Sequence, residues 1–265
     1  MPILVVAATA LELSAALGAR AGQLKGQLKG QLGGAVVPAL VHGREVLACV
    51  SGLGVINASL ALGAALARGG VDALSSPISG VVSLGVAGSF DLDAHPVGSV
   101  RLVEKEIWPE YGLLATGWCS ADATALGFAL GQVQCPADDS IGDSTGNATR
   151  SAVVWDRLAW DATAALARLG LCPGPWVRAK SLTVSGVTAD QERAELLRAR
   201  HQADLENMEG FALAYGCAVA GLPFAELRAV SNAVGARPPV SWDLPGALAA
   251  LGQAAELLFR HGCGE

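Results

Sequence analysis

Short, continuously apolar runs alternate with helical patterns along most of this chain. The runs Ile3–Ala8 and Gly80–Val86 are apolar or small at nearly every position. Strands of this kind are buried on both faces, which is typical of parallel sheets that carry helices on each side. This alternation predicts an α/β fold.

The same patterns give approximate bounds for each element. Strands are expected over Ile3–Ala8, Val36–Leu40, Val46–Ser51, Gly80–Val86, Ser99–Glu104, Ser181–Ser185 and Phe224–Val230. Helices are expected over Leu11–Leu17, Val55–Arg68, Ala159–Arg168, Asp190–Arg200, Gly210–Ala220 and Pro245–His261. Composition nowhere changes enough to mark a linker. We therefore expect residues 1–265 to form one three-layer αβα domain.

Charge and hydropathy exclude several classes of partner. The net charge of −6 argues against a nucleic-acid surface, which needs clustered Lys and Arg. Residues 46–67 carry no charge, but their glycine-rich start favours a strand-to-helix junction over a membrane helix. The N-terminus has no basic residue before Arg20, which disfavours a signal peptide. A cytoplasmic protein that binds neither nucleic acid nor membrane is expected.

Cysteine and histidine are too dispersed to indicate a metal site. The six Cys include no Cys-x-x-Cys pair, so reduced and mostly buried thiols are expected. The four His residues are equally scattered. No metal or organic cofactor is expected. The duplicated Lys-Gly-Gln-Leu segment within residues 23–34 indicates a surface loop, to which we assign no function.

Ligands of α/β proteins bind at the carboxyl ends of the strands, so polar residues there are the candidates for a site. Glu12 follows the first strand and forms a capping box with Thr9, which would use its carboxylate to accept a backbone N–H. The same carboxylate could act as a general base. The sequence around Glu12 alone leaves both roles open.

Three further motifs are equally ambiguous when taken singly. Ala87 and Gly88, in "SLGVAGSF", could bind an anion or a water with their backbone N–H groups, or form an ordinary tight turn. In "ENMEGFA", Met208 could be a core residue, and Glu209 could complement the dipole at the start of a helix. The Glu209 carboxylate could instead accept hydrogen bonds from two sugar hydroxyls. Ser231 and Asn232 could form a polar turn or contact a heterocycle.

In combination and in this order, the motifs resemble the nucleoside phosphorylase/hydrolase superfamily over nearly the whole chain. Within it, they are similar to 5′-methylthioadenosine/S-adenosylhomocysteine nucleosidases. The resemblance implies a central twisted mixed sheet. The roles that it implies are a water-activating base, a Met-Glu pair on the ribose, a late Arg-x-x-Ser-Asp motif and a Gly-rich loop beside the water. Glu12 is the counterpart of the base, and Met208 and Glu209 are the counterparts of the pair on the ribose. Arg228 and Ser231 match the late motif, and Ala87 and Gly88 match the Gly-rich loop.

Asn232 departs from that pattern, because the nucleosidases carry Asp at this position. An amide cannot protonate N7 of adenine, but it can donate to a purine O6 and accept from a protonated N7. The expected base is therefore hypoxanthine. The sequence that follows, "AVGARPPVSWDLPGAL", is similar to that of futalosine hydrolases, which release hypoxanthine from futalosine in the alternative menaquinone pathway. Arg237 and Trp242 are candidates to bind the 5′ benzoate arm of futalosine, with a surface Arg and a helix-anchoring Trp as the alternative.

Three competing functions stay open at this point. A purine nucleoside phosphorylase is disfavoured, because no Arg lies beside the Gly-rich loop in sequence and "VAATALEL" lacks the Gly-Arg phosphate element. An adenine-specific nucleosidase is disfavoured by Asn232. A non-enzymatic nucleoside-binding domain is the third alternative. It differs from an enzyme in that Glu12→Gln should abolish turnover while sparing binding only if the protein is an enzyme. The resemblance also implies a homo-oligomer, a dimer or larger, in which a neighbour can close the pocket.

Overall fold

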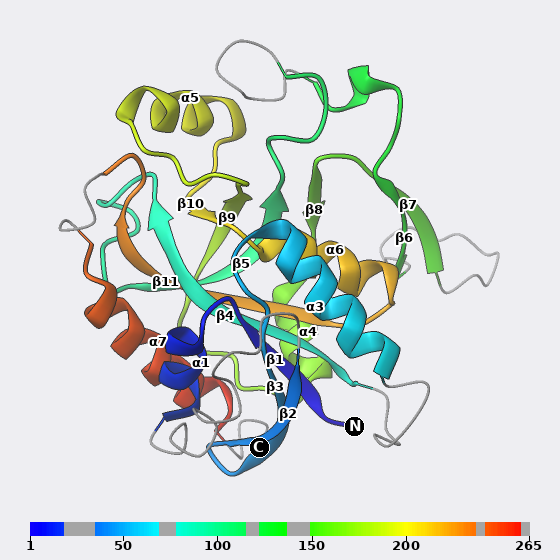
Figure 1. Cartoon of the computed structure of the whole chain (residues 1–265), viewed down its shortest axis with the longest axis vertical. Helices are drawn as coiled ribbons and strands as arrows, with labels where there is room; N and C mark the ends of the chain where they lie inside the picture. The colour runs from blue at the N-terminus through cyan, green and yellow to red at the C-terminus, as the bar shows by residue number, and fades with distance from the viewer. Residues whose placement is uncertain (19–34, 69–77, 115–121, 137–148, 237–241, 261–265) are drawn as a thin grey trace.

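Nine strands form one mixed sheet in the part of the chain that the computed structural model describes, residues 1–18, 35–68, 78–114, 122–136, 149–236 and 242–260 (Figure 1). Their order is β10 (Leu205–Asn207), β9 (Val177–Thr183), β5 (Val100–Ile107), β11 (Phe224–Ala233), β4 (Gly80–Ser89), β1 (Ile3–Ala7), β3 (Arg44–Val50) and β2 (Val36–Val41), with β8 (Arg157–Ala159) paired to β5. β10 also pairs with β4, so five strands close into a ring. The expected mixed sheet is confirmed.

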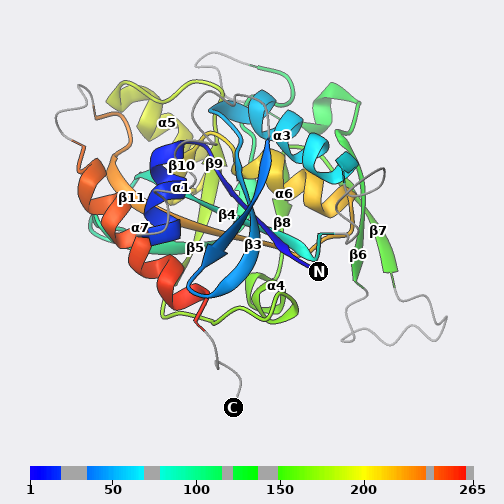
Figure 2. The same ribbon diagram turned by 60° about the horizontal axis from the view of Figure 1, so that its bottom comes forward.

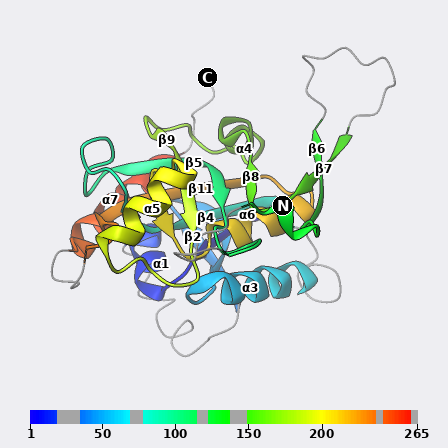
Figure 3. The same ribbon diagram turned by 90° about the horizontal axis from the view of Figure 1, so that it is seen from above.

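Helices cover both faces of this sheet. α1 (Ala10–Leu17), α4 (Ala162–Arg168) and α7 (Leu244–Leu258) share one apolar core, to which Leu13, Leu166 and Leu251 contribute. α3 (Gly54–Arg68) and α6 (Gly210–Val219) form the second core, with Leu62 and Leu213. Figure 2 shows α1 beside α7, and Figure 3 shows α3 along an outer side of the molecule. The three-layer arrangement is therefore as expected.

The central strands bring their carboxyl ends to one edge. β1, β3, β4 and β11 are mutually parallel along the pairs β3–β1, β1–β4 and β4–β11. β4 and β11 are buried along nearly their whole length, which explains why most of their residues are apolar or small. A bulge between Val230 and Asn232 shifts the register, so that Asn232 pairs with Gly88. The predicted site residues therefore converge at this edge.

Several elements differ from the sequence-based expectation. The helix expected over 159–168 begins at Ala162, because Asp161 caps it by accepting from the Ala164 N–H at 2.9 Å. The residues before it form β8 instead. The strand expected over 181–185 begins at Val177, and β10 was not expected. α5 (Gln191–His201) lies over the end of β9, where Leu197 packs on Leu182 and Val184.

A separate hairpin was also missed. β6 (Gly131–Pro136) and β7 (Thr149–Val154) pair with each other, and residues 137–148 between them lie outside the described part. The pair lies at the end of α6 (Figure 2), where Tyr215 donates its hydroxyl to the Leu130 carbonyl at 3.2 Å. A short 3₁₀ helix, η2 (Thr124–Leu126), precedes it.

The cysteines fit the expectation in part. Cys49 and Cys217 are free and buried, whereas Cys172 is disulfide-bonded, so the expectation of reduced thiols is wrong at that position. Across the described ranges, no helix is both long and apolar enough to span a bilayer. The repeat of residues 23–34 lies outside the described part.

Candidate active site at the strand ends

Glu12 is both a helix cap and a site residue. Its Oε2 accepts from the backbone N–H and the hydroxyl of Thr9, at 2.9 and 2.7 Å, and the Thr9 Oγ1 accepts from the Glu12 N–H. This is the predicted capping box. The other oxygen, Oε1, accepts from the Val86 N–H at 3.0 Å, although 74 residues separate the two. The cap therefore places the buried carboxylate beside the end of β4.

Glu209 stands at the start of α6 and is also buried. Its Oε1 accepts from the Gly54 N–H at 3.0 Å, where the chain turns with a φ of 86° into α3. Its own N–H donates to the side chain of Asn207 at 2.8 Å. Burial raises the pKa of Glu209, and the nearby Arg228 opposes that rise. The carboxylate is thus held by a backbone donor on one side and by a cation on the other.

Arg228 occupies the space between these acids. The Nη1 atom lies 3.5 Å from Glu209 Oε2 and donates to the Val86 carbonyl at 3.4 Å. The Nε atom donates to Glu226 at 2.7 Å. Burial alone would lower the pKa of Arg228, but Glu226 and Glu209 outweigh it and raise the pKa above its ordinary value. Arg228 is therefore a fixed cation that joins Glu209 to the end of β4.

Ser231 and Asn232 are held in a defined orientation rather than in a loose turn. The Ser231 hydroxyl donates to Asn232 Oδ1 at 2.7 Å, and Asn232 Nδ2 donates to the Ala233 carbonyl at 2.8 Å. Both residues are buried. These bonds leave the amide one further N–H donor and one further lone pair. An amide in this state can contact a heterocycle through both of its ends.

The other predicted residues have different environments. Ala87 is buried at the end of β4, and a side chain on Gly88 would press on Asn232 Nδ2. Met208 is partly buried and packs with Phe90 on an apolar cluster. Trp242 donates its indole N–H to the Ala236 carbonyl at 3.2 Å, which ties the segment before α7 to the end of β11. Arg237 lies outside the described residues.

Sequence reasoning missed a group of buried polar residues behind Arg228. Glu226 and Arg228 are two apart on β11, so their side chains share a face of the strand. Glu106 on β5, Thr183 on β9 and Asn207 at the end of β10 reach the same place. The one available signal was the pair of charged residues within "FAELRAV", a strand that is otherwise apolar.

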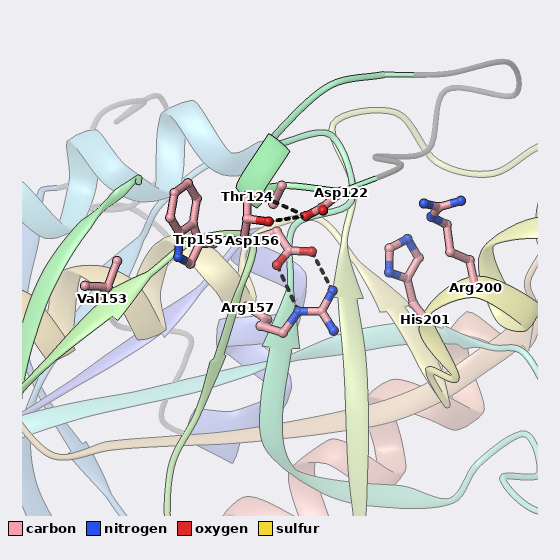
Figure 4. Close-up of a pocket in the computed structure, with 9 residues that line it drawn as sticks. Asp122, Thr124, Val153, Trp155, Asp156, Arg157, Arg200 and His201 are labelled. Atoms are coloured by element: carbon pink, nitrogen blue, oxygen red, sulfur yellow. Dashed lines mark hydrogen bonds and ion pairs between the residues drawn. The ribbon is translucent and has the colours of Figure 1, made fainter. Parts of the chain in front are cut away.

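A cavity of about 410 Å³ lies apart from these residues (Figure 4). It is lined by Asp122, Ala123, Thr124, Val153, Trp155, Asp156, Arg157, Arg200 and His201. Arg157 binds Asp156 through two hydrogen bonds of 2.8 and 2.7 Å, so this guanidinium is already paired. Burial lowers the pKa of His201 to about 4, so its imidazole is neutral at neutral pH. None of the predicted site residues lines this cavity.

The chain is similar to known proteins over nearly its whole length. A family profile described as the phosphorylase superfamily matches residues 2–260. The chain belongs to this superfamily. The chain is 33% identical over 216 residues to a futalosine hydrolase of Thermus thermophilus, covering 79% of each protein. It is 47% identical over 95 residues to a futalosine hydrolase of Streptomyces coelicolor, covering 32% of this chain and 40% of that protein.

Solved structures agree on the fold. A 5′-methylthioadenosine/S-adenosylhomocysteine nucleosidase of Helicobacter pylori, in complex with butyl-thio-DADMe-Immucillin-A, has a TM-score of 0.62 at 15% identity over 97% of both chains. The native futalosine hydrolase of the same organism has a TM-score of 0.59 at 15% identity, again over 97% of both chains. The family resemblance inferred from the motifs is thus confirmed. Among the described residues, no group of three His, Cys, Asp or Glu is arranged to hold a metal ion.

The close approach of Arg228 to Glu12 depends on Gly85. A Cβ at this position would lie 2.5 Å from Arg228 Nη1 and 3.0 Å from Glu12 Oε1. We expect Gly85→Ala to lower the free energy of unfolding by about 1–3 kcal/mol through overpacking. Chemical denaturation measures this change. Gly63→Ala, in the helix α3 with open space around it, is the matched control and should instead be neutral or stabilising. Equal stability of the two variants would contradict the tight packing.

Proposed function

We propose that this protein hydrolyses the N-glycosidic bond of futalosine, releasing hypoxanthine and dehypoxanthine futalosine. The observation that carries the proposal is Asn232, an amide at the strand end, oriented by Ser231 and paired with Gly88 of the neighbouring strand. The similarity to the Thermus thermophilus futalosine hydrolase over 79% of the chain supports the same substrate. The menaquinone pathway and a cytoplasmic location stay predictions.

Glu12 is proposed to activate the attacking water. Its two oxygens accept three hydrogen bonds, from Thr9 twice and from Val86, which fix the carboxylate and leave Oε1 one further acceptor position. General-base assistance of this kind contributes about 10²–10⁴-fold to a rate. No metal or organic cofactor takes part in the proposed reaction.

Glu209 is proposed to bind the ribose hydroxyls and to stabilise the positive charge that develops on the ring as the bond breaks. The transition state resembles an oxocarbenium ion, by analogy with glycosidases. Met208 would pack against the sugar from the adjacent position. Ala87 and Gly88 would border the water, since the Val86 N–H beside them holds Glu12.

The departing base is proposed to be hypoxanthine, held by the free N–H and lone pair of Asn232. The N–H would donate to O6, and the carbonyl would accept from N7–H. An adenine would place its exocyclic amine against the amide N–H, which leaves buried donors unpaired. Trp242 and Arg237 stay the proposed contacts of the 5′ benzoate arm.

Hydrolysis rather than phosphorolysis is supported by the charges around the Gly-rich loop. Arg228 is the guanidinium that reaches Val86, but it is already engaged by Glu226 and Glu209. A phosphate bound there would be repelled by the carboxylates of Glu12 and Glu209, and Arg228 would not be available to neutralise its charge. Water carries no such penalty.

A second copy of this chain is proposed to cover α3. Ile56 and Leu60 are more than half exposed and lie four residues apart on one face of α3, and the similarly exposed Leu53 directly precedes the helix. The patch adjoins Gly54, whose N–H binds Glu209, so a neighbouring subunit on it would lie beside the proposed ribose position. The proposal is a homo-oligomer of at least two subunits.

Glu12→Gln should remove the general base while keeping the shape of the site. In phosphate-free buffer we expect the wild type to release hypoxanthine from futalosine and the variant to lose about 10²–10⁴-fold in kcat. Calorimetric titration should show futalosine binding within a few-fold of the wild type. Glu45→Gln, at an exposed position on β3, is the control. Undiminished hydrolysis by Glu12→Gln, or strict dependence on phosphate in the wild type, would contradict the proposal.

Asn232→Asp should move base preference toward adenine, because a carboxyl can protonate N7 and accept from the exocyclic amine. The measurement compares kcat/KM for futalosine and for its 6-amino analogue in both proteins. We expect the ratio to shift by about tenfold or more toward the amino compound. An unchanged ratio would remove Asn232 from base recognition, and adenine release by the wild type would overturn the choice of substrate.

Ile56→Glu should disrupt the proposed subunit contact by placing a charge in an apolar interface. Analytical ultracentrifugation is expected to show an oligomer for the wild type and a monomer for the variant. Leu196→Glu on α5, a partly exposed leucine outside the patch, controls for added charge. A monomeric wild type at micromolar concentration would contradict the proposal.

A further inference from the structure

We propose that Glu106 and Glu226 share one proton that resides on Glu106, leaving Glu226 as the ionised counterion that positions Arg228 and, through it, Glu209. The inference rests on the proposed function only where Glu209 is assigned to the ribose. Glu226 is here a positioning residue, since its contact is with Arg228 rather than with substrate.

The two carboxyl groups lie side by side and are completely buried. Glu106 comes from β5 and Glu226 from β11, two adjacent antiparallel strands. One oxygen of each reaches the space that a side chain on residue 210 would fill, which explains the glycine at the start of α6. Two adjacent carboxylates without solvent strongly disfavour double ionisation. Burial, with Glu226 adding to it, accordingly raises the pKa of Glu106 well above its ordinary value.

The surrounding charges require at least one proton in this region. Glu12, Glu106, Glu209 and Glu226 surround Arg228, which is the buried cation in contact with the group among the described residues. The remaining residues that contact Glu106, which are Thr183 of β9 and Asn207 of β10, are neutral. Full ionisation of all four acids would bury several uncompensated charges, which is strongly unfavourable.

The hydrogen bonds indicate which acid holds the proton. Burial raises the pKa of Glu226 as well, but its Oε1 is in direct contact with the guanidinium of Arg228 at 2.7 Å, which opposes that rise and stabilises the ionised form. Among the described residues no cation is in direct contact with Glu106. Its oxygens accept from the neutral donors Thr183 and Asn207 at 2.6 Å each, and these bonds favour the ionised form but are outweighed by burial and by the neighbouring Glu226. Glu226 Oε2 is buried and has no hydrogen-bond partner in the described part of the chain. The atoms of the two carboxyl groups that share the space beside Gly210 are Glu106 Oε1 and Glu226 Oε1, so we assign the proton on Glu106 as a donor toward the Glu226 carboxylate.

The link to the site runs through Arg228. With Nε fixed by Glu226, the Nη1 atom is directed at Glu209 Oε2 and the Val86 carbonyl. Asn207 adds a second connection, because its Nδ2 donates to Glu106 and its Oδ1 accepts from the Glu209 and Gly210 N–H groups. The acid pair therefore supports both the cation beside Glu209 and the backbone that carries Glu209.

Two isosteric variants separate the two acids. Glu106→Gln reproduces a neutral carboxyl, whereas Glu226→Gln removes the charge that pairs with Arg228. We expect Glu226→Gln to lower kcat for futalosine by about 10²-fold, the loss that misplacement of a supporting group can cause, and Glu106→Gln to lower it far less. Glu106→Gln should also match or exceed the wild type in free energy of unfolding at neutral pH. Equal losses, or a larger loss in Glu106→Gln, would overturn the assignment of the proton.

Infrared difference spectroscopy of the substrate-free protein tests the shared proton without reference to activity. At neutral pH, the wild type minus Glu106→Gln should show the carbonyl stretch of a neutral carboxylic acid. Glu104→Gln, two residues away on the same strand and partly exposed, should give no such band. Absence of the band would overturn the inference even if Glu226→Gln failed to fold. A wild type that does not cleave futalosine, but shows the band, would refute the proposed function alone.

Discussion

The buried guanidinium of Arg228 is the interaction on which the candidate site depends. It lies at 2% exposure and contacts Glu226, Glu209 and the Val86 carbonyl. Removing one partner from a buried ion pair is strongly destabilising, because it leaves a charge without water or a counterion. Arg228 therefore cannot be regarded as an interchangeable surface cation. It joins the middle of β11 to the end of β4 and to the first residue before α6.

The topology supplies the second constraint. Three parallel pairings place the ends of β3, β1, β4 and β11 along one edge, and the helices that follow begin there. Glu12 reaches that edge because α1 starts three residues after β1. The bulge in β11 then turns Asn232 to pair with Gly88. Residues far apart in sequence meet because each follows its own strand, which is the general reason that α/β sheets bind ligands at this edge.

Much of this arrangement could be predicted, because it depends on local patterns. The apolar runs identified the central strands, and the Thr9–Glu12 spacing identified the capping box that the structure contains. The sequence left the use of Glu12 open, since a cap and a base need the same carboxylate. The structure shows that one oxygen satisfies the cap while the other faces the end of β4. The functional roles of these residues remain predictions.

The acid pair could not be predicted, because its cause is not local. Glu106 lies in a strand with the charged pattern "VEKEI", which is typical of a solvated face, yet its side chain is completely buried. Only the pairing of β5 with β11 brings it to Glu226. The hairpin β6–β7 was missed for a similar reason, because its apolar residues pack on Phe211 of α6 rather than on a neighbour in sequence.

The distribution of charge around Arg228 also bears on the choice between phosphorolysis and hydrolysis. A phosphorylase needs cations that remain available to an incoming anion. Here the cation at the Gly-rich loop has its Nε committed to Glu226 and its Nη1 directed at Glu209, so two buried acids already neutralise it. An anion entering this region would have to displace a buried carboxylate from a guanidinium, at a cost comparable to breaking a buried pair. A neutral water needs only the remaining acceptor position of Glu12, so the arrangement of acids around one arginine favours hydrolysis.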